Sequence, residues 1–264
     1  MKAVITCAGT GTRLLPFTDQ LPKEMIPVFF KSEFGIQTKP LIQLIFENLY
    51  DVGIREFCFI TSEKKTTLQN HFSSNTKNPI MNSFYKKLSD SKITWIIQNS
   101  PNGFGDAVLH AKSFVNNNNF ILQAGDVSLP PDKLDVLKKL LDLISDSNTN
   151  AIVSVKPVSE PKRHGIVTLE NNSIIHAVEK PDDPPTNLGI MPIYGFDGTI
   201  FDHLKLLKPG KNNEIQLTDA IQRLVENNNV VNALRVDDEV FWNVGTPDAY
   251  WHALNESHTF SEKS

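Results

Sequence analysis

Apolar runs of strand length alternate with helix-like segments along the first half of this chain. The predicted strands are residues 2–8, 55–61, 93–97, 119–124 and 151–156. The helix-like segments between them include residues 40–51, 64–72, 104–115 and 132–145. Alternation of this kind predicts a mostly parallel sheet with helices on both faces. Ligands bind such sheets at the carboxyl ends of the strands, beside a switch in strand order.

The second half of the chain is less regular. Short predicted strands alternate with helical segments, the strands at 164–169, 173–179, 189–196 and 231–236 and the helices at 198–207, 216–227 and 247–255. This pattern favours a smaller β-rich lobe beside the main sheet. We expect a single domain over residues 1–256, made of two parts that meet near residue 150. A polar tail follows over 257–264, and we expect it to be frayed.

The composition is that of an ordinary globular protein, with 40% hydrophobic and 21% charged residues among 264. A formal net charge of -4 argues against a nucleic-acid partner, which needs a basic face. Cys7 and Cys58 lie in apolar runs, where buried reduced thiols are expected rather than a disulfide, a metal site or a nucleophile. No leader precedes Lys2 and no apolar run reaches membrane length, so we expect a soluble, cytoplasmic protein with no membrane partner.

The first predicted strand runs directly into a loop of small residues, 8–12, which ends at Arg13. Backbone N–H groups in such a loop can form a nest that binds an anion. Arg13 and the later Lys23 add positive charge where a phosphate would bind. The loop lacks the lysine of a P-loop, and Leu14 holds the place of the third glycine in a dinucleotide fingerprint. The pattern indicates a nucleoside triphosphate site; an ordinary tight loop is the alternative.

A carboxylate follows the predicted strand 119–124. That strand ends in Gly125-Asp126, so Asp126 lies at the edge of the sheet where ligands are expected. A carboxylate there suits Mg²⁺, which takes oxygen ligands and substrate phosphates. The alternative is that Asp126 only caps the following turn.

A polar segment, Gln98–Ala107, precedes another predicted helix. Gly103 and Gly105 lie at the start of that helix, where backbone N–H groups are free. The amide of Gln98 carries both a donor and an acceptor, so it can read the edge of a nucleobase. An ordinary surface glutamine is the alternative for Gln98 taken alone.

Two strings carry a resemblance to a known family: Ala8-Gly9-Thr10-Gly11-Thr12-Arg13-Leu14-Leu15-Pro16 and Pro22-Lys23-Glu24-Met25-Ile26-Pro27. They resemble the sugar-1-phosphate nucleotidyltransferases, and the Lys-Glu-Met form is a feature of the bacterial and archaeal UTP–glucose-1-phosphate uridylyltransferase branch. Further similar strings occur along nearly the whole chain. The resemblance implies an α/β, Rossmann-like nucleotidyltransferase fold with a mixed, mostly parallel sheet. It also implies a nucleotide-binding part at about 1–150 and a smaller β-rich, sugar-binding part at about 151–256.

The resemblance implies roles for individual residues. Those implied to bind the nucleotide are Ala8, Gly9, Thr10, Gly11, Thr12, Arg13, Lys23, Gln98, Gly103 and Asp126. Those implied to bind the sugar phosphate are Gly165, Glu179, Lys180 and Asn187. They come from the strings His164-Gly165, Glu179-Lys180-Pro181 and Asn187-Leu188-Gly189. The catalytic set is Arg13, Lys23, Asp126 and Lys180. Residues 214–221 match a stretch of the uridylyltransferase branch, in which Thr218 or Asp219 can serve a helix start.

Two positions depart from the family pattern. The implied metal, Mg²⁺, has Asp126 as one ligand, but its second ligand position is Asn243 where the family has aspartate. Asn243 keeps a carbonyl oxygen and loses the charge, which weakens Mg²⁺ binding; Asp237 and Asp238 lie nearby in sequence. Residues 191–193 replace a Gly-Arg of the uridylyltransferase branch, which bears on the choice of sugar.

The function that the resemblance implies is nucleotidyl transfer. UTP and glucose 1-phosphate would condense to UDP-glucose and pyrophosphate by a Mg²⁺-dependent in-line attack on the α-phosphate. Two alternatives stay open: an enzyme that uses dTTP or another hexose 1-phosphate, and a catalytically weak homologue that binds nucleotide sugars and regulates a partner. The resemblance also implies a homo-oligomer, a dimer or a tetramer.

Overall fold

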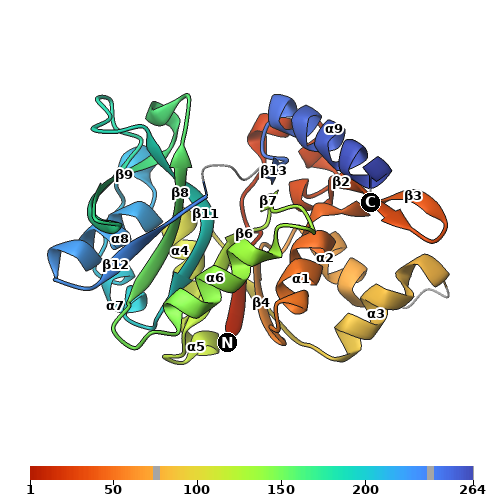
Figure 1. Ribbon diagram of the computed structural model, residues 1–264, viewed down its shortest axis with the longest axis horizontal. Coiled ribbons are helices and arrows are strands. Elements are labelled where there is room, and N and C mark those ends of the chain that lie inside the picture. Colours follow the sequence, from red (N-terminus) through yellow and green to blue (C-terminus); the bar gives the residue numbers. More distant parts are fainter. Residues whose placement is uncertain (74–77, 237–240, 264) are drawn as a thin grey trace.

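The computed structural model describes residues 1–73, 78–236 and 241–263. Its main element is a nine-stranded sheet with the order β5-β4-β1-β6-β11-β8-β12-β10-β9 (Figure 1). The strands are β1 (Lys2–Thr6), β4 (Glu56–Thr61), β5 (Lys92–Ile97), β6 (Phe120–Ala124), β8 (Ala151–Pro157), β9 (Gly165–Glu170), β10 (Ser173–Glu179), β11 (Leu188–Phe196) and β12 (Val231–Arg235).

The sheet changes character at β11. From β5 to β6 all neighbouring strands are parallel, as the alternating pattern predicted. β11 is antiparallel to both β6 and β8, and β8 is parallel to β12. The β-rich second part is therefore an extension of the main sheet rather than a separate sheet, because β11 forms hydrogen bonds with a strand from each part. The sheet is mixed, in agreement with the expected fold.

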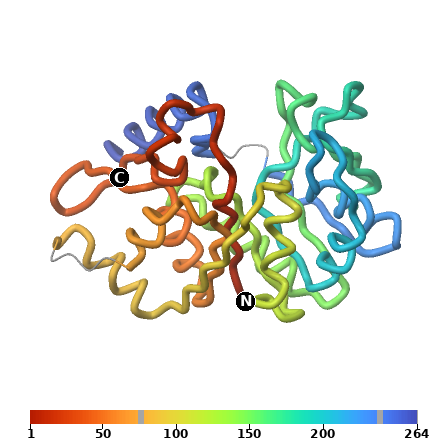
Figure 2. Tube along the Cα trace, turned by 180° about the vertical axis from the view of Figure 1, so that it is seen from behind, coloured from red at the N-terminus to blue at the C-terminus, as the bar shows by residue number. Residues whose placement is uncertain are grey.

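Nine α-helices lie in the described residues. They are α1 (Leu41–Asp51), α2 (Thr66–Ser73), α3 (Asn82–Ser89), α4 (Phe104–His110), α5 (Lys112–Val115), α6 (Leu134–Ile144), α7 (Ile200–Leu204), α8 (Leu217–Glu226) and α9 (Pro247–Lys263). Hydrophobic residues of α1, α2, α3 and α6 join one core, and those of α4, α5, α7 and α8 join the other. Figures 1 and 2 show these two groups from opposite sides of the sheet.

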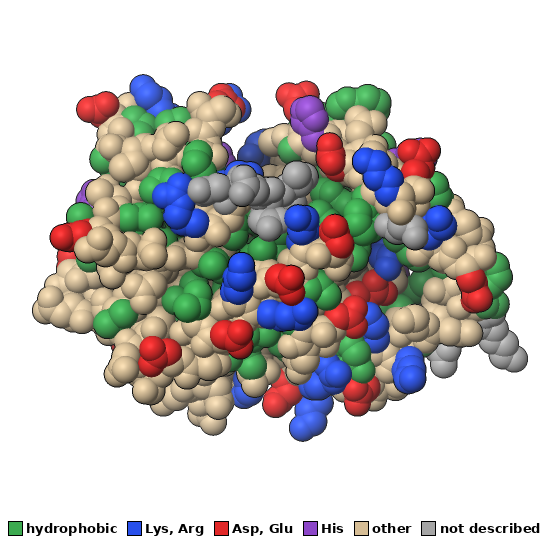
Figure 3. All heavy atoms as spheres, viewed as in Figure 1, with side chains coloured by type: hydrophobic (Ala, Val, Ile, Leu, Met, Phe, Trp, Pro, Cys, Tyr) green, Lys and Arg blue, Asp and Glu red, His purple; other side chains and the backbone are tan. Residues whose placement is uncertain are grey.

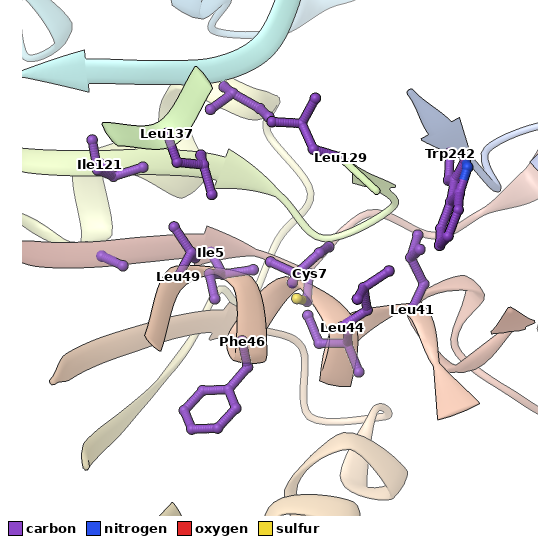
Figure 4. Close-up of a cluster of buried hydrophobic side chains, with 14 of the residues drawn as sticks. Ile5, Cys7, Leu41, Leu44, Phe46, Leu49, Ile121, Leu129, Leu137 and Trp242 are labelled. Carbon is purple, nitrogen blue, oxygen red and sulfur yellow. The ribbon is translucent and has the colours of Figure 1, made fainter. Parts of the chain in front are cut away.

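The two cores follow from the alternation of side chains along each strand. In β1, Ala3 and Ile5 face one core and Val4 faces the other, and all three are fully buried. In the first core Ile5 and Cys7 pack with Leu44 and other residues of α1 (Figure 4). Apolar residues on both faces of a parallel strand are what a doubly covered sheet requires.

The structure also differs from the sequence-based expectations in three places. A hairpin of β2 (Pro27–Ser32) and β3 (Gly35–Pro40) was not predicted, and nor was α3. Residues 257–263 are not a frayed tail but the end of α9, in which Ser257 and Ser261 are buried. The Ser257 hydroxyl accepts a hydrogen bond from the backbone N–H of Phe29 at 3.1 Å, which ties this helix to the hairpin.

The two cysteines are free and buried, as predicted. Burial raises the pKa of the Cys58 thiol to about 12, and burial also raises that of Cys7 well above its usual value. Both are therefore protonated and unreactive at neutral pH. Among the residues that the structure describes, no helix combines the length and the apolar character needed to cross a bilayer.

Candidate active site

The register of the sheet brings the two predicted phosphate-site motifs together. β1 and β6 are parallel neighbours, with Thr6 opposite Ala124 at their carboxyl ends. The small-residue loop leaves β1 at the same level at which Gly125-Asp126 leaves β6. At this edge the surface dips between the two halves of the molecule (Figure 3).

A cavity of about 310 Å³ lies at this edge. Its lining includes many of the residues predicted to bind the nucleotide, namely Ala8, Gly9, Thr10, Arg13, Lys23, Gln98, Gly103 and Asp126. Thr6, Glu24, Pro101, Phe104, Ala107, Ala124 and Glu214 complete it. Gly11 and Thr12 do not line the cavity. Gly11 instead makes the turn, with a φ of 71° and a carbonyl that accepts from the Thr18 hydroxyl at 2.9 Å.

Lys23 and Asp126 form an ion pair inside the cavity. Lys23 Nζ donates to Asp126 Oδ2 at 2.5 Å. Burial alone lowers the pKa of Lys23, but the carboxylates of Asp126 and Glu24 outweigh it and leave that pKa above its usual value. Burial alone raises the pKa of Asp126, and the charge and hydrogen bond of Lys23 outweigh it and hold that pKa below its usual value. Both groups are charged at neutral pH.

A second ion pair lies directly behind the first and was not predicted. Glu24 is fully buried, and its carboxylate accepts from Lys65 Nζ at 2.8 Å and 3.0 Å. Lys65 Nζ also donates to the carbonyl of Cys7 at 2.6 Å. Lys65 therefore joins the end of β1 to the turn that carries Lys23. Neither residue carried a signal of this pair in the sequence, because Glu24 follows a lysine and Lys65 lies in a charged run.

The predicted second metal position, Asn243, is not part of the cavity lining but lies close to Asp126. β13 (Trp242–Asn243) pairs with β7 (Val127–Ser128), which places Asn243 opposite Val127. A Cβ added to Gly245 would lie 3.0 Å from Asn243 Oδ1, 3.1 Å from Asp126 Oδ2 and 3.7 Å from an Arg13 terminal nitrogen. Gly245 thus leaves a space on which these three side chains converge. Asp237 and Asp238 lie outside the described residues.

Gln98 is held in one orientation by a carboxylate that sequence reasoning did not identify. Its Nε2 donates to Asp106 Oδ2 at 2.6 Å. Since a carboxylate only accepts, the Gln98 amide must present its N–H₂ to Asp106 and keep Oε1 for another donor. Gly103 has a φ of 118°, which favours glycine, and lies beside Gln98 at the start of α4.

Three of the four residues predicted to bind the sugar phosphate form a second cluster. Glu179 ends β10, and its Oε1 pairs with Lys180 Nζ at 2.9 Å. A Cβ on Gly165 would lie 3.1 Å from Glu179 Oε2, so Gly165 leaves room at this carboxylate. Asn187 is exposed and lines a groove with Glu160 and Arg163, and its role in sugar binding stays a prediction.

The sequence suggested Thr218 or Asp219 for a helix start, and both residues lie in the first turn of α8. Gln216 is the N-cap of α8, and the Thr218 hydroxyl donates to Glu179 Oε2 at 2.7 Å. Both oxygens of Glu179 are therefore engaged, one by Lys180 and one by Thr218. The contact between Thr218 and Glu179 could not be predicted from the sequence, because the two residues are far apart along the chain.

Comparison with known proteins supports a common origin along nearly the whole chain. Residues 2–259 match the family described as Nucleotidyl transferase. The UTP–glucose-1-phosphate uridylyltransferase of Streptococcus pneumoniae serotype 4 is 35% identical over 245 residues, which cover 84% of this chain and 79% of that protein. The bifunctional protein GlmU of Methanococcus aeolicus is 33% identical over 265 residues. That alignment covers 98% of this chain but 56% of GlmU, so this chain spans little more than half of GlmU.

A solved structure shares the fold. The crystal structure of a UDP-glucose pyrophosphorylase complexed with UDP-glucose superposes with a TM-score of 0.84 at 28% identity, covering 100% of this chain and 99% of that one. The order and direction of the strands are thus those of a known nucleotidyltransferase. The protein belongs to the nucleotidyl transferase family, as a sugar-1-phosphate nucleotidyltransferase similar to the UDP-glucose pyrophosphorylases.

Proposed function

We propose that this protein transfers the uridylyl group of UTP to glucose 1-phosphate, forming UDP-glucose and pyrophosphate. The observation that carries the proposal is the Lys23–Asp126 pair in a cavity lined by the small-residue loop and Arg13. This cavity presents backbone and cationic groups for a polyphosphate and one carboxylate for a metal ion. The similarity to the pneumococcal uridylyltransferase supports the choice of UTP and glucose 1-phosphate.

The reaction needs no covalent enzyme intermediate, because the substrate already carries the nucleophile. A phosphate oxygen of the sugar 1-phosphate attacks the α-phosphorus, and the bond to pyrophosphate breaks as the new P–O bond forms. The obstacle is the repulsion between two polyanions, so positioning and charge neutralisation supply the catalysis. Lys23 neutralises charge at the α-phosphate, Arg13 stabilises the leaving pyrophosphate, and Lys180 holds the attacking phosphate.

The orientation of Gln98 supports a uracil or thymine base. With Nε2 held by Asp106, Gln98 offers an acceptor, Oε1, to a ligand. The imide N–H of uracil or thymine donates to such an acceptor. Gln98 is therefore compatible with UTP and with dTTP without separating them, and the nucleotide panel below tests the other bases.

The donors beside Gly245 fit a magnesium ion that also takes ligands from substrate. Mg²⁺ is commonly held by one or two carboxylates together with phosphates. Asp126 supplies a carboxylate and Asn243 a carbonyl oxygen, which already accepts the N–H of Gly245 at 2.7 Å. No group of three or more His, Cys, Asp or Glu side chains suited to a metal occurs among the described residues. When bound, the ion would supply positive charge between the reacting phosphates.

Replacing Asn243 by aspartate is expected to lower the Mg²⁺ concentration needed for half-maximal activity by about tenfold, because a second carboxylate adds charge to the site. The measurement is the initial rate at saturating substrates across a Mg²⁺ titration. Asn255→Asp on the exposed side of α9 adds the same charge elsewhere and serves as the control. An unchanged midpoint in Asn243→Asp would exclude residue 243 from the metal site.

Pyrophosphate release tests the proposed function. The wild-type protein is incubated with Mg²⁺, each of UTP, dTTP, CTP and ATP, and a panel of hexose 1-phosphates. Release that is highest with UTP and glucose 1-phosphate supports the proposal. A preference for dTTP or for another hexose 1-phosphate would keep the mechanism and change the substrate.

A second candidate function follows from Asn243, whose missing charge weakens the metal site: a homologue that binds a nucleotide sugar without turning it over. UDP-glucose binding measured by calorimetry, together with no pyrophosphate release from any substrate pair, would favour this candidate. Recovery of turnover in Asn243→Asp would then identify residue 243 as the cause.

A further inference from the structure

One short segment touches both subsites of the proposed reaction. Residues 214–218, here called the strap, lead into α8. The strap starts at the nucleotide cavity, which Glu214 lines. It ends at Thr218, which is hydrogen-bonded to Glu179 in the sugar cluster. Only three residues separate these two ends.

The first end of the strap is hydrogen-bonded to the turn beside Gln98. The N–H of Ile215 donates to the carbonyl of Asn102 at 2.8 Å, and the N–H of Gly105 donates to the carbonyl of Ile215 at 2.8 Å. The packing there leaves no space for a methyl group. A Cβ on Gly103 would lie 2.6 Å from the Ile215 oxygen, and one on Gly105 would lie 2.9 Å from it. A shift of the turn at residues 102–105 would therefore shift the strap as well.

The second end of the strap determines how Glu179 is held. Thr218 is buried, and its hydroxyl donates to Glu179 Oε2, while Lys180 pairs with Oε1. A Cβ on Gly165 would lie 2.6 Å from Thr218 Oγ1, so a larger residue there would break this contact. α4 and α8, which flank the strap, also pack against each other on the same face of the sheet (Figure 2).

We propose that the strap couples the nucleotide and sugar subsites, and that Thr218 is the positioning residue that orients Glu179 toward the hydroxyls of a hexose 1-phosphate. The proposal rests on the function proposed above. When both oxygens of Glu179 are held, its carboxylate accepts from the sugar hydroxyls in one geometry. Because Glu179 is ordered before the sugar binds, binding does not have to supply the entropy cost of ordering it. Since the other end of the strap is bonded to the base-side turn, a displaced turn moves Thr218 and misaligns Glu179.

The first test replaces Thr218 by valine, which keeps the shape and removes the hydroxyl. We expect KM for glucose 1-phosphate and Kd for UDP-glucose to rise about tenfold, equivalent to about 1.4 kcal/mol, with KM for UTP within about twofold of wild type. Thr218→Ser should restore near-wild-type values because it returns the donor. The matched control is Thr199→Val, which removes another threonine hydroxyl that donates to a carboxylate, that of Asp197, outside the site.

The second test acts on the other end of the strap. Gly105→Ala places a methyl group against Ile215 without adding any group to the Glu179 cluster. We expect it to raise Kd for UDP-glucose, and to add little when combined with Thr218→Val, because both changes act on Glu179 through the same contact. Fully additive effects would overturn the coupling, even if Thr218 still positions Glu179.

The outcomes separate this proposal from the proposed function. Suppose that the wild type turns over its substrates and that Thr218→Val has the same sugar affinities as Thr199→Val. This result would overturn the role of Thr218 and leave the proposed function intact. If wild type shows no turnover but binds UDP-glucose, the Kd comparison still decides the proposal. If wild type does not bind UDP-glucose, both proposals fail. Should Gly105→Ala fail to fold, as judged by thermal melting, Glu214→Ala at the same end of the strap replaces it in the combination with Thr218→Val, and additive effects would again overturn the coupling.

Discussion

Replacing Lys23 by alanine is expected to lower kcat by at least about 100-fold, the loss typical when one preorganised charged or hydrogen-bonding group is removed from a reacting centre. The structure gives the reason: Lys23 lies in the cavity beside the small-residue loop, paired with Asp126. Asp126→Ala should cause a loss of the same order, because it removes the only carboxylate we assign to the metal. Steady-state kinetics at saturating UTP and glucose 1-phosphate measure both.

A matched control separates loss of chemistry from loss of folding. Lys39 forms an equally short ion pair with Glu47, and the side chains of this pair are each 12% exposed, against 15% and 14% for Lys23 and Asp126. Lys39→Ala should therefore disturb stability to a similar degree while kcat stays near wild type. Near-normal turnover in both Lys23→Ala and Asp126→Ala would show that this pair is not the catalytic centre.

Replacing Lys65 by methionine is expected to cost about 3–5 kcal/mol of unfolding free energy, because it leaves the fully buried Glu24 carboxylate without its partner. Lys65 also supplies the donor for the Cys7 carbonyl, which the variant leaves unbonded to a side chain. Urea denaturation followed by circular dichroism measures the loss. Lys138→Met removes the lysine of an exposed ion pair and should change stability by less than about 1 kcal/mol.

The pH dependence of the Lys65→Met variant carries a definite sign. Burial, which Lys65 and Lys23 only partly offset, already raises the pKa of Glu24 above its usual value. A carboxyl whose folded pKa lies above its unfolded pKa favours the folded state at low pH, and this contribution is lost as pH rises through the folded pKa. Without Lys65 that pKa rises further, so the destabilisation should be larger at pH 8 than at pH 5.

A double replacement identifies the source of the Lys65→Met effect. Glu24→Met combined with Lys65→Met removes both buried charges and should recover most of the lost stability, since apolar pairs of similar volume often match a buried ion pair. A double variant as unstable as the single one would mean that the unbonded Cys7 carbonyl, rather than the unpaired Glu24, carries the cost.

Most strands and helices of the first half, though not β2, β3 and α3, could be predicted because their signal is local. Every predicted strand there overlaps an observed one, since an apolar run such as β1 serves a sheet that is covered on both faces. The hairpin of β2 and β3 gave no such signal: Lys31, Gln37 and Lys39 interrupt its apolar residues, and α9 covers it. The end of α9 was missed for the same reason, because its buried residues include serines that a polar segment does not reveal.

Within the site, the residues on continuous motifs were the predictable ones. The loop 8–12 with Arg13, the Lys23 turn and Asp126 could each be read as sequence strings, and the parallel register of β1 and β6 brings them together. Asn187 belongs to such a string, yet it lies on another groove. Its role in sugar binding stays a prediction.

The sequence by itself determined which chemistry is available to this protein: a small-residue loop after β1, the carboxylates of Asp126 and Glu179, and the cations Arg13, Lys23 and Lys180. Only the tertiary structure decided which groups act on one another. Three side-chain hydrogen bonds show this, each between residues of different segments: Lys65 with Glu24, Gln98 with Asp106, and Thr218 with Glu179. Local patterns follow from the periodicity of helices and strands, whereas these contacts depend on how the sheet and its helices pack together.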